Sequence, residues 1–311
     1  MRQPVVTSPP AIPLRPARRA PGGERLTIGL LNNMPDTALA ATERQFARLL
    51  GDEVRLLRFH LPEIARSPQA LDYLAPRSAP ADALESAGLD ALIVTGCEPR
   101  AADLRDEPSW PALTRVVDWA RDNTASTLFS CLAAHAAVLH LDGVARRRLP
   151  RKRAGVFACR AQGRHPLLAG LPETLPVPHS RWNELPETDL AAAGYAVLTR
   201  SEEAGVDLFV RPGRSLFVFL QGHPEYDPDS LAREYRRDLA RFLAGERPDR
   251  PDLPAHYFDS ASLDAAGNDP SAMVPPADPA WPGMARALFA NWLALVAARR
   301  GARAADAASA A

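Results

Sequence analysis

Short apolar runs alternate with amphipathic stretches along most of this chain. The runs are rich in Val, Ile, Leu and Phe, which is typical of strands buried on both faces. The expected strands cover residues 26–31, 54–59, 89–96, 126–130 and 215–220. Apolar positions at helical spacing predict helices over residues 42–50, 110–121, 132–139, 231–242 and 281–299. This alternation predicts an α/β fold with a mostly parallel sheet and helices on both faces.

Polar and small residues mark the limits of the folded part. Residues 1–23 are rich in Pro, Ala and Arg and predict a disordered tail. We expect a single domain over residues 24–299, and the polar stretch 245–279 predicts an excursion or lid within it. Residues 300–311 are expected to fray as a second disordered tail.

Composition excludes several classes of protein. The 311 residues carry a formal net charge of zero, which gives no general attraction to nucleic acid or to anionic membranes. No apolar run is long enough to span a bilayer, and the first residues lack the pattern of a secretory signal. Three widely spaced cysteines argue against a disulfide framework and a zinc site. We therefore expect a cytoplasmic protein with no metal and no bound cofactor.

Three residues form a candidate catalytic group. His223 and Glu225, two residues apart in an extended segment, project to the same side of the backbone. The carboxylate can then hold one imidazole nitrogen while the other faces a nucleophile. Cys131 follows one predicted strand and precedes a predicted helix, whose N-terminus favours a thiolate. Because ligands bind beyond the carboxyl ends of parallel strands, these residues are predicted to meet there.

Other interpretations of these residues stay open. Cys131 could be a buried thiol, and the His-Glu pair could be structural. His135 lies one helical turn after Cys131 and is an alternative base. We expect the remaining cysteines, Cys97 and Cys159, to be inert.

Several motifs in a shared order carry a resemblance to a known family. They lie at residues 28–35, 42–46, 92–96, 126–131, 178–181, 222–227, 268–270 and 288–293. On these motifs the chain resembles the homoserine O-acyltransferases of the succinyltransferase type, over nearly its whole predicted domain. These enzymes share the flavodoxin-like fold of class I glutamine amidotransferases. The elbow sequence Phe-Ser-Cys-Leu-Ala, at residues 129–133, departs from the Gly-x-Cys-x-Gly of the amidotransferases and fits the acyltransferases better.

The resemblance implies a reaction between small molecules. Cys131 would attack an acyl-CoA, the co-substrate, and hold the acyl group as a thioester. His223 would take a proton from the hydroxyl of L-homoserine, oriented by Glu225, in a step of methionine biosynthesis. The backbone N–H groups of Leu132 and Asn33 would stabilise the oxyanion. Family members usually form homodimers, so a homodimer is also implied.

The resemblance further places Ser180, Arg181 and Arg237 at the amino-acid site, where a guanidinium can hold an α-carboxylate. Arg100 aligns with the position that sorts succinyl from acetyl donors, and its charge favours succinyl-CoA. Arg100 could equally be a surface residue. The basic residues 146–148 and 151–153 could meet CoA phosphates or form a solvated face.

Two departures from the family bear on the substrate. The family's lysines after Met-Pro are replaced by Asp36-Thr37-Ala38, and its Glu-His-His is replaced by Ala158-Cys159-Arg160. Another hydroxy amino acid therefore remains an alternative acceptor. A glutamine amidotransferase or related hydrolase and a non-enzymatic relative are the rival functions.

Overall fold

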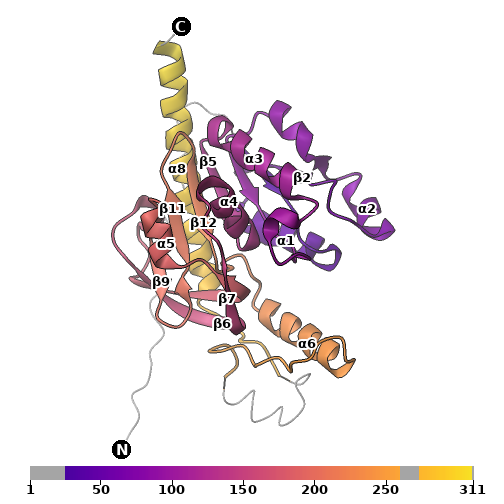
Figure 1. Cartoon of the computed structure of the whole chain (residues 1–311). Coiled ribbons are helices and arrows are strands. Elements are labelled where there is room, and N and C mark those ends of the chain that lie inside the picture. Colours follow the sequence, from indigo (N-terminus) through magenta and orange to yellow (C-terminus); the bar gives the residue numbers. More distant parts are fainter. Residues whose placement is uncertain (1–24, 260–272, 310–311) are drawn as a thin grey trace, which may run out of the picture.

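A twisted eight-stranded sheet forms the centre of the computed structural model, which describes residues 25–259 and 273–309. Its strands, in spatial order, are β3 (Ala79–Pro80), β2 (Val54–His60), β1 (Leu26–Leu31), β4 (Ala91–Val94), β5 (Ser126–Ser130), β12 (Leu216–Leu220), β11 (Leu208–Arg211) and β8 (Ala196–Val197). The first six are mutually parallel, whereas β11 is antiparallel to both of its neighbours. The mostly parallel sheet predicted from the apolar runs is therefore confirmed (Figure 1).

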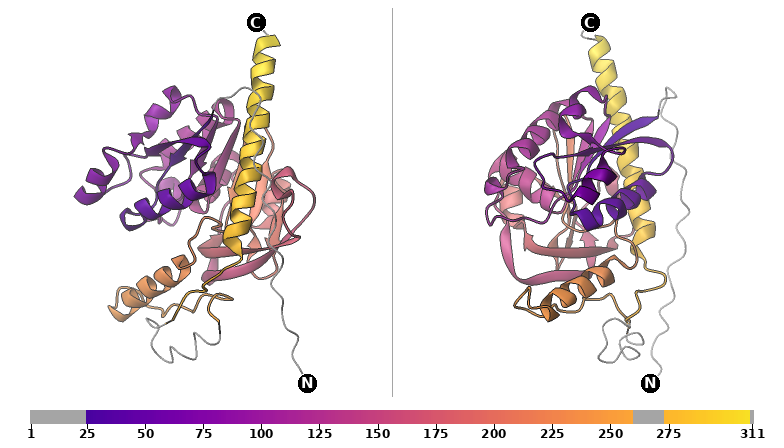
Figure 2. Two further views of the ribbon diagram at one scale, coloured as in Figure 1. Left: turned by 180° about the vertical axis from the view of Figure 1, so that it is seen from behind. Right: turned by 90° about the vertical axis from the view of Figure 1, so that its right-hand side faces the viewer.

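Helices cover both faces of this sheet. On one face pack α3 (Trp110–Asn123), α4 (Leu132–Asp142) and α5 (Glu187–Ala192). On the other pack α1 (Leu39–Leu50) and the long α8 (Trp281–Ser309), which bury Phe46, Phe289 and Trp292. Figure 2 shows α8 running along the molecule and projecting past it at the C-terminal end.

Short elements complete the chain around the sheet. They are α2 (Pro68–Leu74) and the 3-10 helices η1 (Asp36–Ala38), η2 (Ala81–Ser86), η3 (Leu104–Asp106) and η4 (Pro166–Leu168). Residues 245–259 and 273–279 form no helix or extended strand, although Ala255 bridges to Gly155. No helix of the described residues is long and apolar enough to cross a membrane.

A second, antiparallel sheet was not predicted. It contains β6 (Arg147–Ala161), β7 (Thr174–Glu184), β9 (Thr199–Ser201) and β10 (Gly205–Val206). The backbone N–H of His223 donates to Pro178 O at 2.7 Å, so β7 lies directly beyond the carboxyl end of β12. Helix α6 (Ser230–Leu243) follows and lies next to this sheet in both views (Figures 1 and 2). The carboxyl end of the main sheet is thus covered rather than open.

The last helix is longer than expected. It was predicted to end at residue 299, but α8 continues to Ser309. The added turns are rich in Ala, and Arg299 and Arg303 donate to backbone carbonyls of residues 122–125 and 213–214. Residues 1–23 and the motif at 268–270 lie outside the described residues, and the single domain over 24–299 stays a prediction.

Candidate active site

Cys131 lies on a sharp turn between β5 and α4. Its backbone has φ 51° and ψ −110°, and a positive φ is costly for a residue with a side chain. The turn is held because Cys131 N–H donates to Leu220 O, at 2.7 Å, on the neighbouring strand β12. This geometry lifts the thiol out of the sheet at the carboxyl end of β5, as the strand-Cys-helix pattern predicted.

His223 and Glu225 lie beside this thiol, at the end of β12. His223 Nδ1 is 2.8 Å from Glu225 Oε1, and the two residues are 6% and 4% exposed. Burial alone would lower the pKa of His223, but the Glu225 carboxylate and the hydrogen-bonded Cys131 raise that pKa well above its usual value. The three residues therefore meet as predicted, with the imidazole between sulfur and carboxylate.

The N-terminus of α4 faces Gly96, which follows β4. A Cβ atom on Gly96 would lie 2.6 Å from Leu132 Cβ and 2.9 Å from Leu132 N. Only glycine leaves the space in front of the Leu132 N–H open, and that N–H belongs to the first helical turn, where backbone donors lack intrahelical partners. The backbone N–H of Asn33 was predicted to stabilise the oxyanion together with that of Leu132. In the structure it already donates to Thr95 Oγ1 at 2.8 Å. The backbone N–H of Gly96, next to Leu132, has no hydrogen-bond acceptor in the described part of the chain and is therefore available as a second donor.

Ser180 and Arg237 join a charged cluster between β6, β7 and α6. Ser180 Oγ donates to Glu234, and Arg237 Nη2 donates to Asp238 Oδ1 at 3.0 Å. Between the two carboxylates lies Lys152, whose Nζ is 3.3 Å from Glu234 Oε2 and 2.8 Å from Asp238 Oδ2. Lys152, Glu234 and Asp238 line a cavity of about 730 Å³.

The sequence interpretation missed the centre of this cluster. In the sequence Lys152 belongs to a basic run, and no local pattern marks Glu234 or Asp238 as functional. The sequence does contain one indication that Lys152 is special. It is the only lysine in the chain, and all other residues of the Lys and Arg class are arginine. Tyr226 donates to Glu234 Oε1 at 2.6 Å and stacks on His223. It therefore joins the charged cluster to the imidazole.

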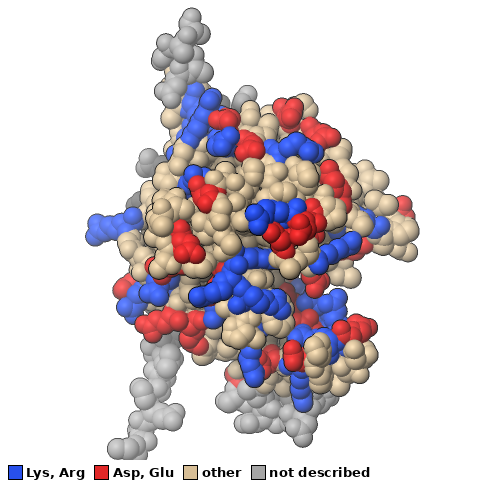
Figure 3. Space-filling model, viewed as in Figure 1, with Lys and Arg blue, Asp and Glu red and all other residues tan. Residues whose placement is uncertain are grey.

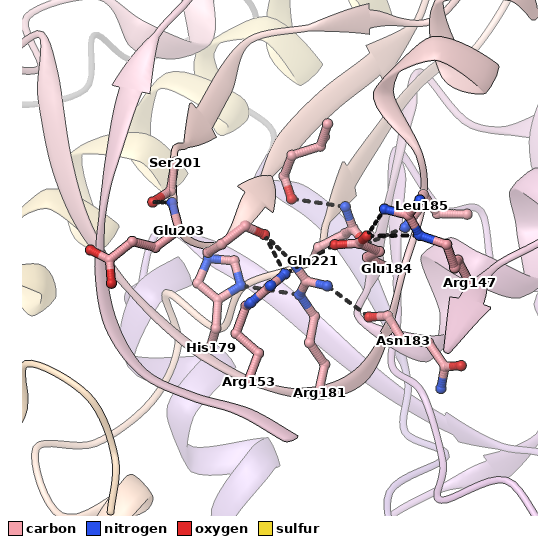
Figure 4. Close-up of polar contacts among 12 residues, drawn as sticks. Arg147, Arg153, His179, Arg181, Asn183, Glu184, Leu185, Ser201, Glu203 and Gln221 are labelled. Atoms are coloured by element: carbon pink, nitrogen blue, oxygen red, sulfur yellow. Dashed lines mark hydrogen bonds and ion pairs between the residues drawn. The ribbon is translucent and has the colours of Figure 1, made fainter. Parts of the chain in front are cut away.

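Arg181 is placed differently from its neighbours in the sequence. Its side chain is buried, with the residue 3% exposed, and Nη1 donates to Asn183 O at 2.7 Å (Figure 4). Nη2 donates to Ala204 O, and Nε donates to His179 Nδ1 at 3.4 Å. Burial lowers the pKa of Arg181 to about 10. All three nitrogens are engaged, so the structure gives no support to a direct substrate contact.

His135 does not serve as an alternative base in this arrangement. Its Nε2 lies 3.1 Å from Gln221 Oε1 inside the protein, and burial lowers its pKa to about 3. An imidazole with this pKa stays neutral near pH 7 and is a poor proton acceptor.

Arg100 lies on an exposed loop that follows β4. Its backbone N–H and that of Ala101 both donate to Glu107 Oε1, at 2.5 and 2.6 Å. Arg146 reaches the same loop and donates to Ala102 O at 3.0 Å. The other terminal nitrogen of Arg146 is buried without a partner in the described part of the chain, and its charge interacts with Cys131. The sequence places Arg146 only within a basic run and gives no sign of this contact.

A second cysteine lies near another histidine and carboxylate. The candidate ligand atoms of Cys159, His179 and Asp207 lie within 4.8 Å of one another, and all three residues are buried. The Nδ1 of His179 accepts from Arg181, so the His179 proton sits on Nε2, toward Asp207 at 3.4 Å. A metal on Nε2 would move the ring proton to Nδ1, where it would face the N–H of Arg181 Nε. Burial also raises the pKa of the fully buried Cys159 thiol, which agrees with the inert role expected for it.

Comparisons with known proteins agree with the geometry. A sequence model of the family described as homoserine O-succinyltransferase matches residues 16–301. A homoserine O-succinyltransferase of Methylorubrum extorquens is 56% identical over 296 residues, covering 90% of this chain and 89% of its own. One from Rhodopseudomonas palustris is 55% identical over 252 residues, covering 79% and 76%. Among solved structures, a glutamine amidotransferase from Thermotoga maritima is similar in fold, with a TM-score of 0.54, 14% identity and coverage of 88% of this chain and 99% of its own.

Proposed function

Because this chain belongs to the homoserine O-succinyltransferase family, we propose that it transfers the succinyl group of succinyl-CoA to the hydroxyl of L-homoserine, a step of methionine biosynthesis. The observation that carries this proposal is the contact of Cys131, on its strained turn, with an imidazole held by Glu225. This group suits acyl transfer through a covalent intermediate.

In the first half-reaction the Cys131 thiolate attacks the carbonyl carbon of the thioester. The carbonyl electrons move to oxygen, and the N–H groups of Leu132 and Gly96 face that oxyanion. The carbonyl then re-forms, the bond to the CoA sulfur breaks, and CoA leaves with the proton that His223 carries. Succinyl-Cys131 remains, beside a neutral imidazole.

In the second half-reaction His223 takes the proton of the homoserine hydroxyl. The resulting oxygen nucleophile attacks the succinyl-Cys131 carbonyl, and the Cys131 thiolate leaves. Glu225 stabilises the imidazolium at both stages, because its carboxylate accepts from Nδ1 at 2.8 Å. The thiolate and imidazolium pair is then restored.

The charged cluster suits an amino acid acceptor. Glu234 and Asp238 can receive an α-ammonium, while Arg237 and Lys152 can receive an α-carboxylate. Ser180 would contact the acceptor beside Glu234. Tyr226 links this cluster to His223, so an acceptor bound here lies next to the base.

Two arginines could meet the second carboxylate of the succinyl group. Arg100 is exposed on the loop after β4, and Arg146 braces that loop with one terminal nitrogen while its other terminal nitrogen has no partner in the described part of the chain. Succinyl-CoA is therefore the proposed donor, in agreement with the names of the related enzymes. The homodimer implied by the family stays a prediction that sedimentation velocity can check.

Release of free CoA tests the proposed function. The purified protein would be mixed with succinyl-CoA or acetyl-CoA, with and without L-homoserine, beside Cys131→Ala. We expect a burst of about one CoA per site without acceptor, then homoserine-dependent turnover, both absent in the variant. Absence of burst and turnover with either donor would contradict the proposal, and L-serine and glutamine would then be assayed.

A further inference from the structure

The basic residues of β6 divide into two groups. Arg147 and Arg153 both pair with Glu184, and Lys152 pairs with the carboxylates of α6. Arg148 makes no ion pair in the described part of the chain. Its guanidinium lies over the indole of Trp182 instead, 4.3 Å from the ring centroid.

A second guanidinium approaches the same indole from a distant segment. Arg247, which follows α6, lies 5.7 Å from the Trp182 ring centroid. Its carboxylate contact is Asp238 at 3.6 Å, and Asp238 is already 2.8 Å from Lys152. Two cations gathered on one ring repel each other, and a bound anion relieves that repulsion. The pair therefore has the character of an anion site.

The surroundings of Trp182 favour a phosphate over other anions. Trp182 and Arg247 line the cavity of about 730 Å³, and the exposed Arg250 lies on its wall. Two other carboxylates of the cavity have partners, since Asp252 pairs with Arg151 and Glu203 lies beside His256, while Asp249 is exposed to solvent. Figure 3 shows Lys and Arg side chains gathered in the zone between α1 and α6. Planar guanidinium groups are well suited to phosphate oxygens.

Two side-chain contacts connect the wall of the cavity with the catalytic histidine. The wall includes Glu234, which accepts from Tyr226, and Tyr226 stacks on His223. On the other side, Arg146 interacts electrostatically with both Arg148 and Cys131. An extended ligand with its anionic end at Trp182 can therefore place its other end near the thiol.

We propose that Arg148 and Arg247, which both lie against the indole of Trp182, bind the phosphate groups of the CoA part of the acyl donor. The inference rests on the proposed function to the extent that the ligand is an acyl-CoA. It adds a subsite for the nucleotide end, far from the reacting bond. The acyl group and the acceptor make no use of these two arginines.

A comparison of two thioester substrates distinguishes binding at this subsite from the acyl-transfer step. Succinyl-CoA carries the nucleotide, whereas succinyl-N-acetylcysteamine has the same reacting bond and no phosphate. For Arg148→Gln with Arg247→Gln we expect KM for succinyl-CoA to rise about tenfold or more, since two charge-assisted hydrogen bonds are lost. KM for the truncated thioester should change less than about twofold, with kcat retained for both. Equal effects on the two thioesters, or no effect on succinyl-CoA, would overturn the proposal.

Controls assign the effect to the phosphates. Arg55→Gln removes an exposed arginine from β2, near the amino end of the parallel strands, and should leave both thioesters unchanged. Raising the ionic strength should raise KM for succinyl-CoA in the wild type and much less in the double variant. Succinyl-dephospho-CoA, which lacks the 3′-phosphate, tells which phosphate is bound. If the double variant still raises KM for this thioester, the arginines bind the diphosphate. If KM for this thioester is the same in both proteins, they bind the 3′-phosphate.

Calorimetry with free CoA separates this proposal from the proposed function. We expect the wild type to bind CoA at least about tenfold more tightly than the double variant, whether or not the protein turns over. Equal binding of CoA by the two proteins would overturn the subsite. Arginine-dependent binding of CoA without succinyl transfer would leave the subsite standing while contradicting the reaction.

Discussion

The ring of Tyr226 stacks on the imidazole of His223, with 4.3 Å between ring centroids and 17° between the ring planes. The Tyr226 hydroxyl meanwhile donates to Glu234, in the cluster proposed to hold the acceptor. One side chain thus fixes the face of the base and the position of a substrate-binding carboxylate.

Tyr226→Phe separates these two roles. The stack on His223 is kept, but Glu234 loses one buried hydrogen bond, at a cost of about 1–2 kcal/mol. We expect KM for homoserine to rise about fivefold to thirtyfold with kcat for the first half-reaction unchanged. Burst and steady-state assays measure these quantities. A slower burst in the Phe variant would contradict the division of roles.

Glu225→Gln tests the charge beside His223. The carboxylate raises the pKa of His223 above its usual 6.5, so the wild-type imidazole keeps its proton as the pH rises past that value. In the Gln variant that pKa should fall, and the proton should be lost at lower pH. NMR titration of the imidazole measures the shift. We expect kcat to fall by about 10²–10⁴. If the pKa of His223 is the same in the Gln variant as in the wild type, the Glu225 carboxylate is not what raises it.

Gly96→Ala tests the oxyanion site. The added methyl group would lie 2.9 Å from Leu132 N, in the space proposed for the thioester oxygen. We expect the acylation burst to slow by about 10²-fold or more. Gly163→Ala is a matched control, because a Cβ there meets no atom within 4 Å. Thermal denaturation of both variants tells a blocked site from a destabilised fold.

Lys152→Met tests the centre of the charged cluster. Without the ammonium, Glu234 and Asp238 face each other with less compensation. Burial raises the pKa of Glu234, and Lys152 is the first of the groups that bring it below its usual value. The variant should therefore be less stable than the wild type near neutral pH, and this deficit should shrink as the pH falls and Glu234 takes up a proton. We expect KM for homoserine to rise about tenfold or more, with partial recovery in Lys152→Arg.

Arg146→Gln and Arg100→Gln test donor selection. Loss of the cation that meets the succinyl carboxylate should lower kcat/KM for succinyl-CoA by about 10–100-fold and leave acetyl-CoA nearly unchanged. The ratio of the two donors is the measurement. We expect the larger effect at Arg146, because its buried terminal nitrogen lacks a partner in the described part of the chain. A parallel loss with both donors would indicate a disordered loop instead.

Sequence patterns predicted those parts of the site whose residues are close together in the chain. The strand before Cys131, the helix after it and the two-residue spacing of His223 and Glu225 each follow from short-range geometry, and all were found. The mostly parallel sheet also follows, because strands that alternate with helices favour parallel pairing.

Long-range pairing could not be predicted in the same way. The Lys152 contacts join residues 82 and 86 positions apart, and no spacing rule covers them. Strand β6 resembles a charge run because Arg147 and Arg153 face Glu184 on β7, and Lys152 faces carboxylates on α6, rather than a buried core. Arg181 was expected to reach a substrate, but the carbonyls of Asn183 and Ala204 capture its guanidinium.

The restriction of lysine to one position has a chemical consequence for a protein that handles a reactive thioester. Amines are acylated by such compounds without an enzyme, whereas guanidinium groups resist acylation at neutral pH. Lys152 is the only lysine, and its amine is held by two carboxylates. All other residues of the Lys and Arg class are arginine. We expect mass spectrometry after long incubation with succinyl-CoA to find succinyl groups on Cys131 and almost none on side-chain nitrogen. The surface is in this sense inert toward the proposed donor.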